Sequence, residues 1–127
     1  RKLKNIPPNI HIYPSVPQLA VLKMTDVFVT HGGMNSVSEA LANGIPMVII
    51  PFVSDQPVNA QCMEHLGISK TLNHASIQID TFKKTVLSVL SDETIKNNMK
   101  QIQNCIKNAP GNKGGAKMII DYYGDLK

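Results

Sequence analysis

The sequence predicts an α/β fold in which helices cover both faces of a parallel sheet. Two apolar segments, Asp26–Thr30 and Ile45–Ile50, have the β-branched composition of strands that are buried on both sides. Segments with helical composition follow each of them, and such alternation is typical of right-handed βαβ units. The 127 residues suffice for one domain, residues 1–127. The few strand candidates suggest that the sheet begins in a longer chain.

Each expected element has its own signal. Alternating apolar and polar residues between two prolines favour a strand at Asn9–Tyr13. Glycine commonly follows the last residue of a helix, and Gly44 and Gly67 end two expected helices. Apolar side chains recur every three or four residues in Glu93–Asn108 and share one face. The expected elements are the strand Asn9–Tyr13, helix Gln18–Met24, strand Asp26–Thr30, helix Asn35–Asn43, strand Ile45–Ile50, helix Val58–Leu66, strand Ile68–Leu72, helices Ile79–Leu90 and Glu93–Asn108, loop Pro110–Gly115 and helix Ala116–Tyr123.

Composition and charge exclude several classes of protein. The apolar content of 43% and the mean hydropathy of −0.07 are typical of soluble globular domains. The longest apolar stretch, around Ile45–Val53, contains two prolines and is far shorter than the roughly 20 residues of a membrane-spanning helix. The net charge of +4 lies entirely in residues 65–127, where lysines are spaced along expected helices, and aromatic residues make up only 5%. We therefore expect no membrane span and no nucleic-acid partner.

The cysteines and the first residues bear on the cellular setting. Cys62 and Cys105 form no CxxC pair, so we expect two buried thiols in a reducing compartment and a cytoplasmic location. Arg1–Pro8 lacks the apolar segment of a signal peptide. The first residue is Arg rather than Met, which indicates a piece of a longer protein. An incomplete sheet exposes an apolar edge or face, and we expect it to promote self-association.

One junction between a strand and a helix carries the strongest functional signal. The buried strand ends in His31–Gly33, so backbone N–H groups lie at the carboxyl edge of the sheet, where open α/β sheets bind ligands. A helix N-terminus favours an anion there, and glycines let the backbone approach it. Asn35 and Ser36 add donors for phosphate oxygens, and Glu39, one turn further, suits a ribose diol. The spacing matches neither G-x-G-x-x-G nor the P-loop.

The same residues also have a purely structural interpretation. Gly32–Gly33 could form only a tight turn, Asn35 could cap the helix and Glu39 could be a surface residue. The next strand end favours a binding site, because Asp55 and Gln56 follow it with an acceptor and a mixed donor and acceptor suited to sugar hydroxyls. Asp55 could equally be the N-cap of the helix that follows.

In combination, these segments resemble the UDP-glycosyltransferases of the GT-B fold. The motifs are VPQLAVL, HGGMNSVSEALANGIPMVIIP and DQPVNA, in this order between Ile10 and Asn59, with a looser similarity through GGAKMII to the end. The bacterial macrolide-glycosyltransferase type is the most similar. The resemblance implies a Rossmann-like sheet and the C-terminal, donor-binding domain of such an enzyme.

The resemblance also implies roles for individual residues. Gln18 and the backbone at Val16 would contact the uracil and ribose, and Glu39 would bind the ribose hydroxyls. The residues that would hold the diphosphate are His31, Gly33, Asn35 and Ser36. The transferred sugar would bind Asp55 and Gln56. Plant relatives carry Trp where Ser15 stands here, so base stacking must come from elsewhere.

The implied activity is inverting transfer of a sugar from a nucleotide sugar, UDP-glucose or similar, to a hydroxyl of a macrolide or another small molecule. The general base and the acceptor contacts belong to an N-terminal domain in this family, so we expect this chain alone to bind the donor without transferring the sugar. No cofactor and no metal are implied. The alternatives are a nucleotide-sugar binding or interaction module without catalysis, a sugar-nucleotide epimerase, or a separate donor subunit.

Overall fold

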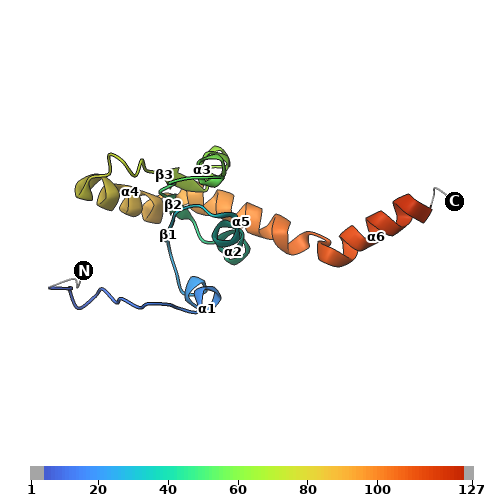
Figure 1. Ribbon diagram of the computed structural model, residues 1–127, viewed down its shortest axis with the longest axis horizontal. Coiled ribbons are helices and arrows are strands. Elements are labelled where there is room, and N and C mark those ends of the chain that lie inside the picture. Colours follow the sequence, from blue (N-terminus) through green and yellow to red (C-terminus); the bar gives the residue numbers. More distant parts are fainter. Residues whose placement is uncertain (1–4, 125–127) are drawn as a thin grey trace.

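A computed structural model of the chain describes residues 5–124 and shows a three-stranded parallel sheet surrounded by helices (Figure 1). The strand order is β1 (Phe28–Thr30), β2 (Met47–Ile49) and β3 (Ser69–Thr71). The helices are α1 (Gln18–Leu22), α2 (Met34–Asn43), α3 (Gln56–His65), α4 (Ile79–Ser91), α5 (Glu93–Asn108) and α6 (Gly111–Gly124). Residues 1–4 and 125–127 of the predicted domain, and with them the start of Arg1–Pro8, lie outside the described part.

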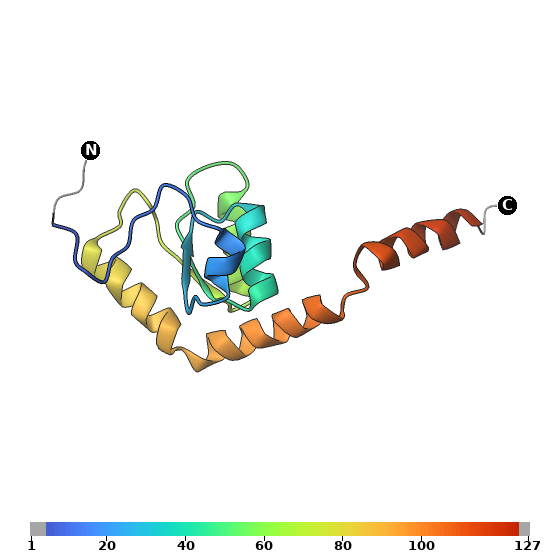
Figure 2. The same cartoon turned by 90° about the horizontal axis from the view of Figure 1, so that it is seen from below.

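The side chains of β2 alternate between two packed layers. Met47 and Ile49 belong to a buried cluster with side chains of α1, α2, α3 and α5. Val48 faces the other side, where it packs in a cluster with Val89 of α4 and Ile95 of α5. Helices therefore cover both faces, and the predicted α/β class with a parallel sheet is confirmed (Figure 2).

Helix α5 closes the amino-terminal end of the sheet. Its apolar face joins the two clusters, because Ile95 belongs to one and Met99 to the other. Asn98 donates to the carbonyl of Gly67 just before β3, and Gln103 donates to a carbonyl at the end of α2. Beyond Asn108 the chain leaves the core, and α6 extends away from it with no buried residue (Figure 2). The carboxyl ends of the strands lie on the opposite side from α5.

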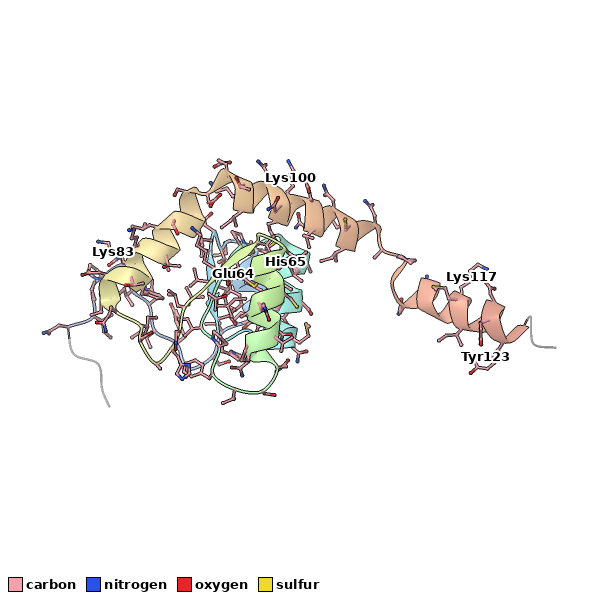
Figure 3. The ribbon with its side chains drawn as sticks, turned by 90° about the horizontal axis from the view of Figure 1, so that it is seen from above. Glu64, His65, Lys83, Lys100, Lys117 and Tyr123 are labelled. Carbon is pink, nitrogen blue, oxygen red and sulfur yellow. The ribbon has the colours of Figure 1, made fainter. Side chains whose placement is uncertain are left out.

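The lysines of the last three helices lie on solvated faces, as their spacing predicts. Lys83 of α4, Lys100 of α5 and Lys117 of α6 are exposed and point away from the core (Figure 3). No described helix has the length and apolar content needed to cross a membrane.

Two predicted elements are wrong. Asn9–Tyr13 is exposed and forms no strand, because a strand needs a neighbour and the only pairings among the described residues are β1 with β2 and β2 with β3. Pro110–Gly115 is not a loop, since α6 already begins at Gly111. Its glycines have low helix propensity, which misled the prediction. The remaining predicted elements are present with boundaries shifted by a few residues at most.

Two further expectations are corrected. Buried apolar runs predict that the strands ending at Thr30 and Ile50 are adjacent and central in the sheet. The two strands are adjacent and parallel, but only β2 is central, and β1 lies at an edge of the described sheet. Cys62 and Cys105 are exposed rather than buried. Each cysteine lies on the outward face of its helix, which the sequence pattern around it did not indicate.

Candidate functional site

The junction between β1 and α2 requires glycine at its centre. Gly32 has a φ of +87°, a conformation that favours glycine, and an added Cβ would lie 2.7 Å from Cγ2 of the buried Ile49. Its N–H is 3.3 Å from the hydroxyl oxygen of Thr30, the last residue of β1. The turn therefore passes directly over the end of β2, and it brings the start of α2 to the carboxyl edge of the sheet.

The N-terminus of α2 is open and lies beside a histidine. Gly33 is the N-cap residue, and no side chain caps the helix, so Asn35 is not the cap. The first helical bond is donated by the N–H of Val37, which leaves the three preceding N–H groups without backbone partners in the helix. A Cβ on Gly33 would lie 2.6 Å from Nε2 of His31, so the imidazole is packed close to Gly33.

These residues surround a shallow hollow. Its volume is about 420 Å³, and it is lined by His31, Gly33, Met34, Asn35 and Ser36. The backbone N–H groups and the dipole of α2 make this end of the helix favourable for an anion. The structure thus brings together the four residues that the resemblance assigns to the diphosphate.

A hydrogen-bonded group lies next to the hollow. The side-chain nitrogen of Gln18, in α1, donates to the Glu39 carboxylate at 2.7 Å and to the Ser36 hydroxyl at 3.3 Å. Both amide hydrogens of Gln18 are thereby engaged, and the Glu39 carboxylate is held in one orientation with Oε1 available. The residues assigned to the base, ribose and phosphate are therefore neighbours. Val16 is 45% exposed and does not line the hollow.

In the second loop, between β2 and α3, hydrogen bonds within the protein leave Asp55 with a free acceptor and Gln56 with free donors. The side-chain oxygen of Gln56 accepts from the N–H groups of Phe52 at 2.9 Å and Val53 at 3.2 Å. Only its NH₂ group then remains to donate to a ligand. Asp55 occupies the N-cap position of α3, but its side chain does not cap the helix. One of its oxygens accepts from Asn59 at 2.9 Å, which leaves the other as an acceptor.

Asn59 joins the two loops. Its side-chain nitrogen lies 2.9 Å from the carbonyl oxygen of Gly32 and 2.9 Å from Oδ2 of Asp55. The residue is only 7% exposed, and both of its amide hydrogens are used. No role for Asn59 is predicted from the sequence. The signal was available, because a polar residue four positions after Asp55 lies on the same face of the helix, here the face that packs on the sheet.

The chain is similar to known proteins over most of its length. Residues 1–113 match the family model described as "UDP-glucoronosyl and UDP-glucosyl transferase". NDP-glycosyltransferase YjiC of Bacillus subtilis is 37% identical over 117 residues, which cover 92% of this chain and 30% of that protein. Oleandomycin glycosyltransferase of Streptomyces antibioticus is 31% identical over 118 residues, covering 93% of this chain and 27% of that protein.

A solved structure supports the same relationship. The glycotransferase of kitacinnamycin superposes with a TM-score of 0.88 at 36% identity, covering 94% of this chain and 31% of that one. The structural neighbours are GT-B glycosyltransferases, so the sheet corresponds to part of that fold. The chain spans about 30% of the length of the relatives it matches. By these matches it belongs to the family of UDP-glucuronosyl and UDP-glucosyl transferases.

Proposed function

We propose that this chain forms the donor-binding part of a cytoplasmic, inverting glycosyltransferase. The enzyme would move a hexose from a nucleotide sugar, UDP-glucose or similar, to a hydroxyl of a small molecule such as a macrolide. The observation that carries the proposal is the open N-terminus of α2, where three free N–H groups, His31, Asn35 and Ser36 surround one hollow. The names of the relatives support a sugar nucleotide as the ligand.

The diphosphate binds at this hollow. Negative charge develops on the leaving diphosphate when its bond to the sugar breaks, and fixed donors aimed at that charge lower the barrier. The N–H groups of α2 and the imidazole of His31 supply such donors without a metal ion. His31 contributes most in the transition state, because its hydrogen bond strengthens as the charge on the phosphate oxygen grows.

The ribose and the sugar bind on either side of the diphosphate. Glu39, held by Gln18, accepts hydrogen bonds from the ribose hydroxyls, and the backbone at Val16 contacts the base. On the other side, Asp55 accepts from a sugar hydroxyl, whereas Gln56 donates to one through its NH₂ group. One acceptor on Asp55 and one donor group on Gln56 fit a hexose, because each of its hydroxyls can donate and accept.

The chain supplies donor binding but no general base. We place the base and the acceptor contacts in the part of the relatives' length that lies outside this chain. The chain alone would then bind the donor and transfer nothing.

Calorimetry on the full-length protein tests the proposal. UDP and UDP-glucose are titrated into the wild type, His31→Ala and a control, His65→Ala, which alters an exposed histidine at the far end of α3. We expect His31→Ala to weaken binding of both ligands and His65→Ala to leave it unchanged. Equal binding by all three proteins would refute the proposed site.

A product assay separates transfer from its alternatives. The full-length enzyme is incubated with UDP-glucose and hydroxyl acceptors, and the anomeric configuration of any glycoside is read by NMR. A β-glycoside from the α-linked donor supports inversion. Binding with no product indicates a module without catalysis, and a changed sugar on the nucleotide indicates an epimerase.

A further inference from the structure

The segment after β3 runs beside the loop that carries Asp55 and Gln56. The parallel pairing of β2 and β3 continues one step beyond the strands, because the N–H of Leu72 donates to the carbonyl of Ile49 at 2.9 Å. Two residues later, Nδ1 of His74 lies 2.9 Å from the carbonyl oxygen of Pro51. The register of the sheet therefore places His74 against the first residue of that loop.

His74 contacts this loop in two ways. A carbonyl oxygen only accepts, so Nδ1 of His74 carries the hydrogen of this bond and donates it to Pro51. The imidazole also stacks on the ring of Phe52, with centroids 4.8 Å apart and planes at 30°. A local turn fixes the histidine itself, since the side chain of Asn73 accepts from the N–H of Ala75 at 2.9 Å.

The loop needs such support. Ser54 has a φ of +62°, a conformation that costs a residue with a side chain on the order of 1 kcal/mol or more. Gln56 holds the loop from inside, through its oxygen and the N–H groups of Phe52 and Val53. His74 holds it from outside, at Pro51 and at the ring of Phe52. These contacts together define where the NH₂ group of Gln56 and the free oxygen of Asp55 lie.

We propose that His74 is a positioning residue that sets the affinity for the sugar of the donor but not for its nucleotide. This inference rests on the proposed function, in which the loop of Asp55 and Gln56 binds the sugar and the N-terminus of α2 binds the diphosphate. His74 contacts only the sugar-binding loop. The hollow at α2 is lined by other residues, so a change at His74 leaves the nucleotide contacts in place.

The experiment compares two ligands on the full-length protein. Calorimetry with UDP and with UDP-glucose is carried out on His74→Phe, which keeps a stacking ring but loses the donor, and on His74→Asn, which keeps a nitrogen donor near the position of Nδ1. We expect His74→Phe to raise the Kd for UDP-glucose about five- to tenfold, the effect of losing one hydrogen bond, and to leave the Kd for UDP unchanged. His74→Asn should restore the affinity for UDP-glucose to within about threefold of wild type, because it keeps that donor.

The matched controls are His65→Phe and His65→Asn, at the exposed histidine at the far end of α3, which should change neither Kd. Thermal denaturation checks that each variant is folded. Equal weakening of both ligands, or unchanged binding of UDP-glucose by His74→Phe, would overturn the role of His74. If His74→Phe does not fold, the Asn variant decides. A rise of more than about threefold in the Kd for UDP-glucose, or an equal rise in the Kd for UDP, contradicts the proposal, and a smaller rise restricted to UDP-glucose supports it.

A further variant distinguishes failure of this inference from failure of the proposed function. Asp55→Asn removes the carboxylate that accepts a hydrogen bond from the donor sugar in the proposed function. It should weaken the binding of UDP-glucose but not the binding of UDP. If Asp55→Asn has this effect and both His74 variants have none, only the role of His74 is wrong. If Asp55→Asn has no effect either, the sugar does not bind at this loop, and the proposed function fails with the inference.

Discussion

Replacement of Gly32 or Gly33 by alanine distinguishes two roles of the turn after β1. We expect Gly32 to be needed for stability, and Gly33 to leave room for His31 beside the hollow. At Gly32 the change demands a left-handed backbone with a Cβ, at about 1–2 kcal/mol, and it forces that Cβ to within 2.7 Å of the buried Ile49 side chain. Overpacking of this kind costs about 1–3 kcal/mol more. We expect Gly32→Ala to lower the free energy of unfolding by about 2–5 kcal/mol, a large part of the roughly 5–15 kcal/mol of a typical domain.

Gly33→Ala should leave the stability nearly unchanged and weaken ligand binding instead. Its φ of −64° and ψ of 139° suit any residue, so the backbone pays nothing. The new Cβ would instead lie 2.6 Å from Nε2 of His31, and the exposed imidazole must rotate away. We expect the free energy of unfolding to change by less than about 1 kcal/mol, the usual effect of a surface substitution. UDP binding should weaken, because His31 leaves the hollow.

Urea denaturation and calorimetry with UDP measure both quantities on the full-length protein. Gly115→Ala is the control, since nothing lies within 4 Å of its added Cβ and alanine favours the helix. The reasoning is refuted if Gly32→Ala is as stable as the wild type, or if Gly33→Ala loses stability while it binds UDP normally.

Three more predictions follow from the same contacts. Asn59→Ala should lower the free energy of unfolding by about 1–3 kcal/mol, because Gly32 and Asp55 lose their donor; urea denaturation tests this, with the exposed Asn97→Ala as an unaffected control. In steady-state kinetics, His31→Ala should lower kcat on the order of 100-fold, whereas Glu39→Ala should mainly raise the KM for the donor. If both variants have a lower melting temperature than the wild type but unchanged kinetics, these roles are contradicted. Residues 1–127 alone should self-associate through the free edge of β1, and a monomer in sedimentation velocity at high concentration would disprove it.

Much of the fold could be predicted because its signals are local. The apolar runs that became β1 and β2, and the glycine after α2, stand out within a few residues of sequence. Asn9–Tyr13 shows where such signals end: its alternation is that of a strand, but a strand also depends on a neighbour distant in sequence. The exposed cysteines illustrate the same limit, since the orientation of a helix depends on packing rather than on the cysteine itself.

The same limit holds for the candidate site, where residues close in sequence could be grouped but contacts between distant residues could not be predicted. His31, Gly33, Asn35 and Ser36 lie within six positions of each other, so one turn was enough to group them. The bond from Gln18 to Glu39 spans 21 positions and that from Asn59 to Gly32 spans 27. The sequence has no local pattern for such contacts. The resemblance to a known family assigned both Gln18 and Glu39 to the ribose, but only the structure revealed the bond between them and the bond made by Asn59.

The bridge made by Asn59 has a thermodynamic consequence. Its two amide hydrogens tie the turn at Gly32 to Asp55, so the two loops do not move independently. The spacing between the two proposed subsites is therefore fixed when the chain folds, and a donor that spans both would lose less conformational entropy on binding.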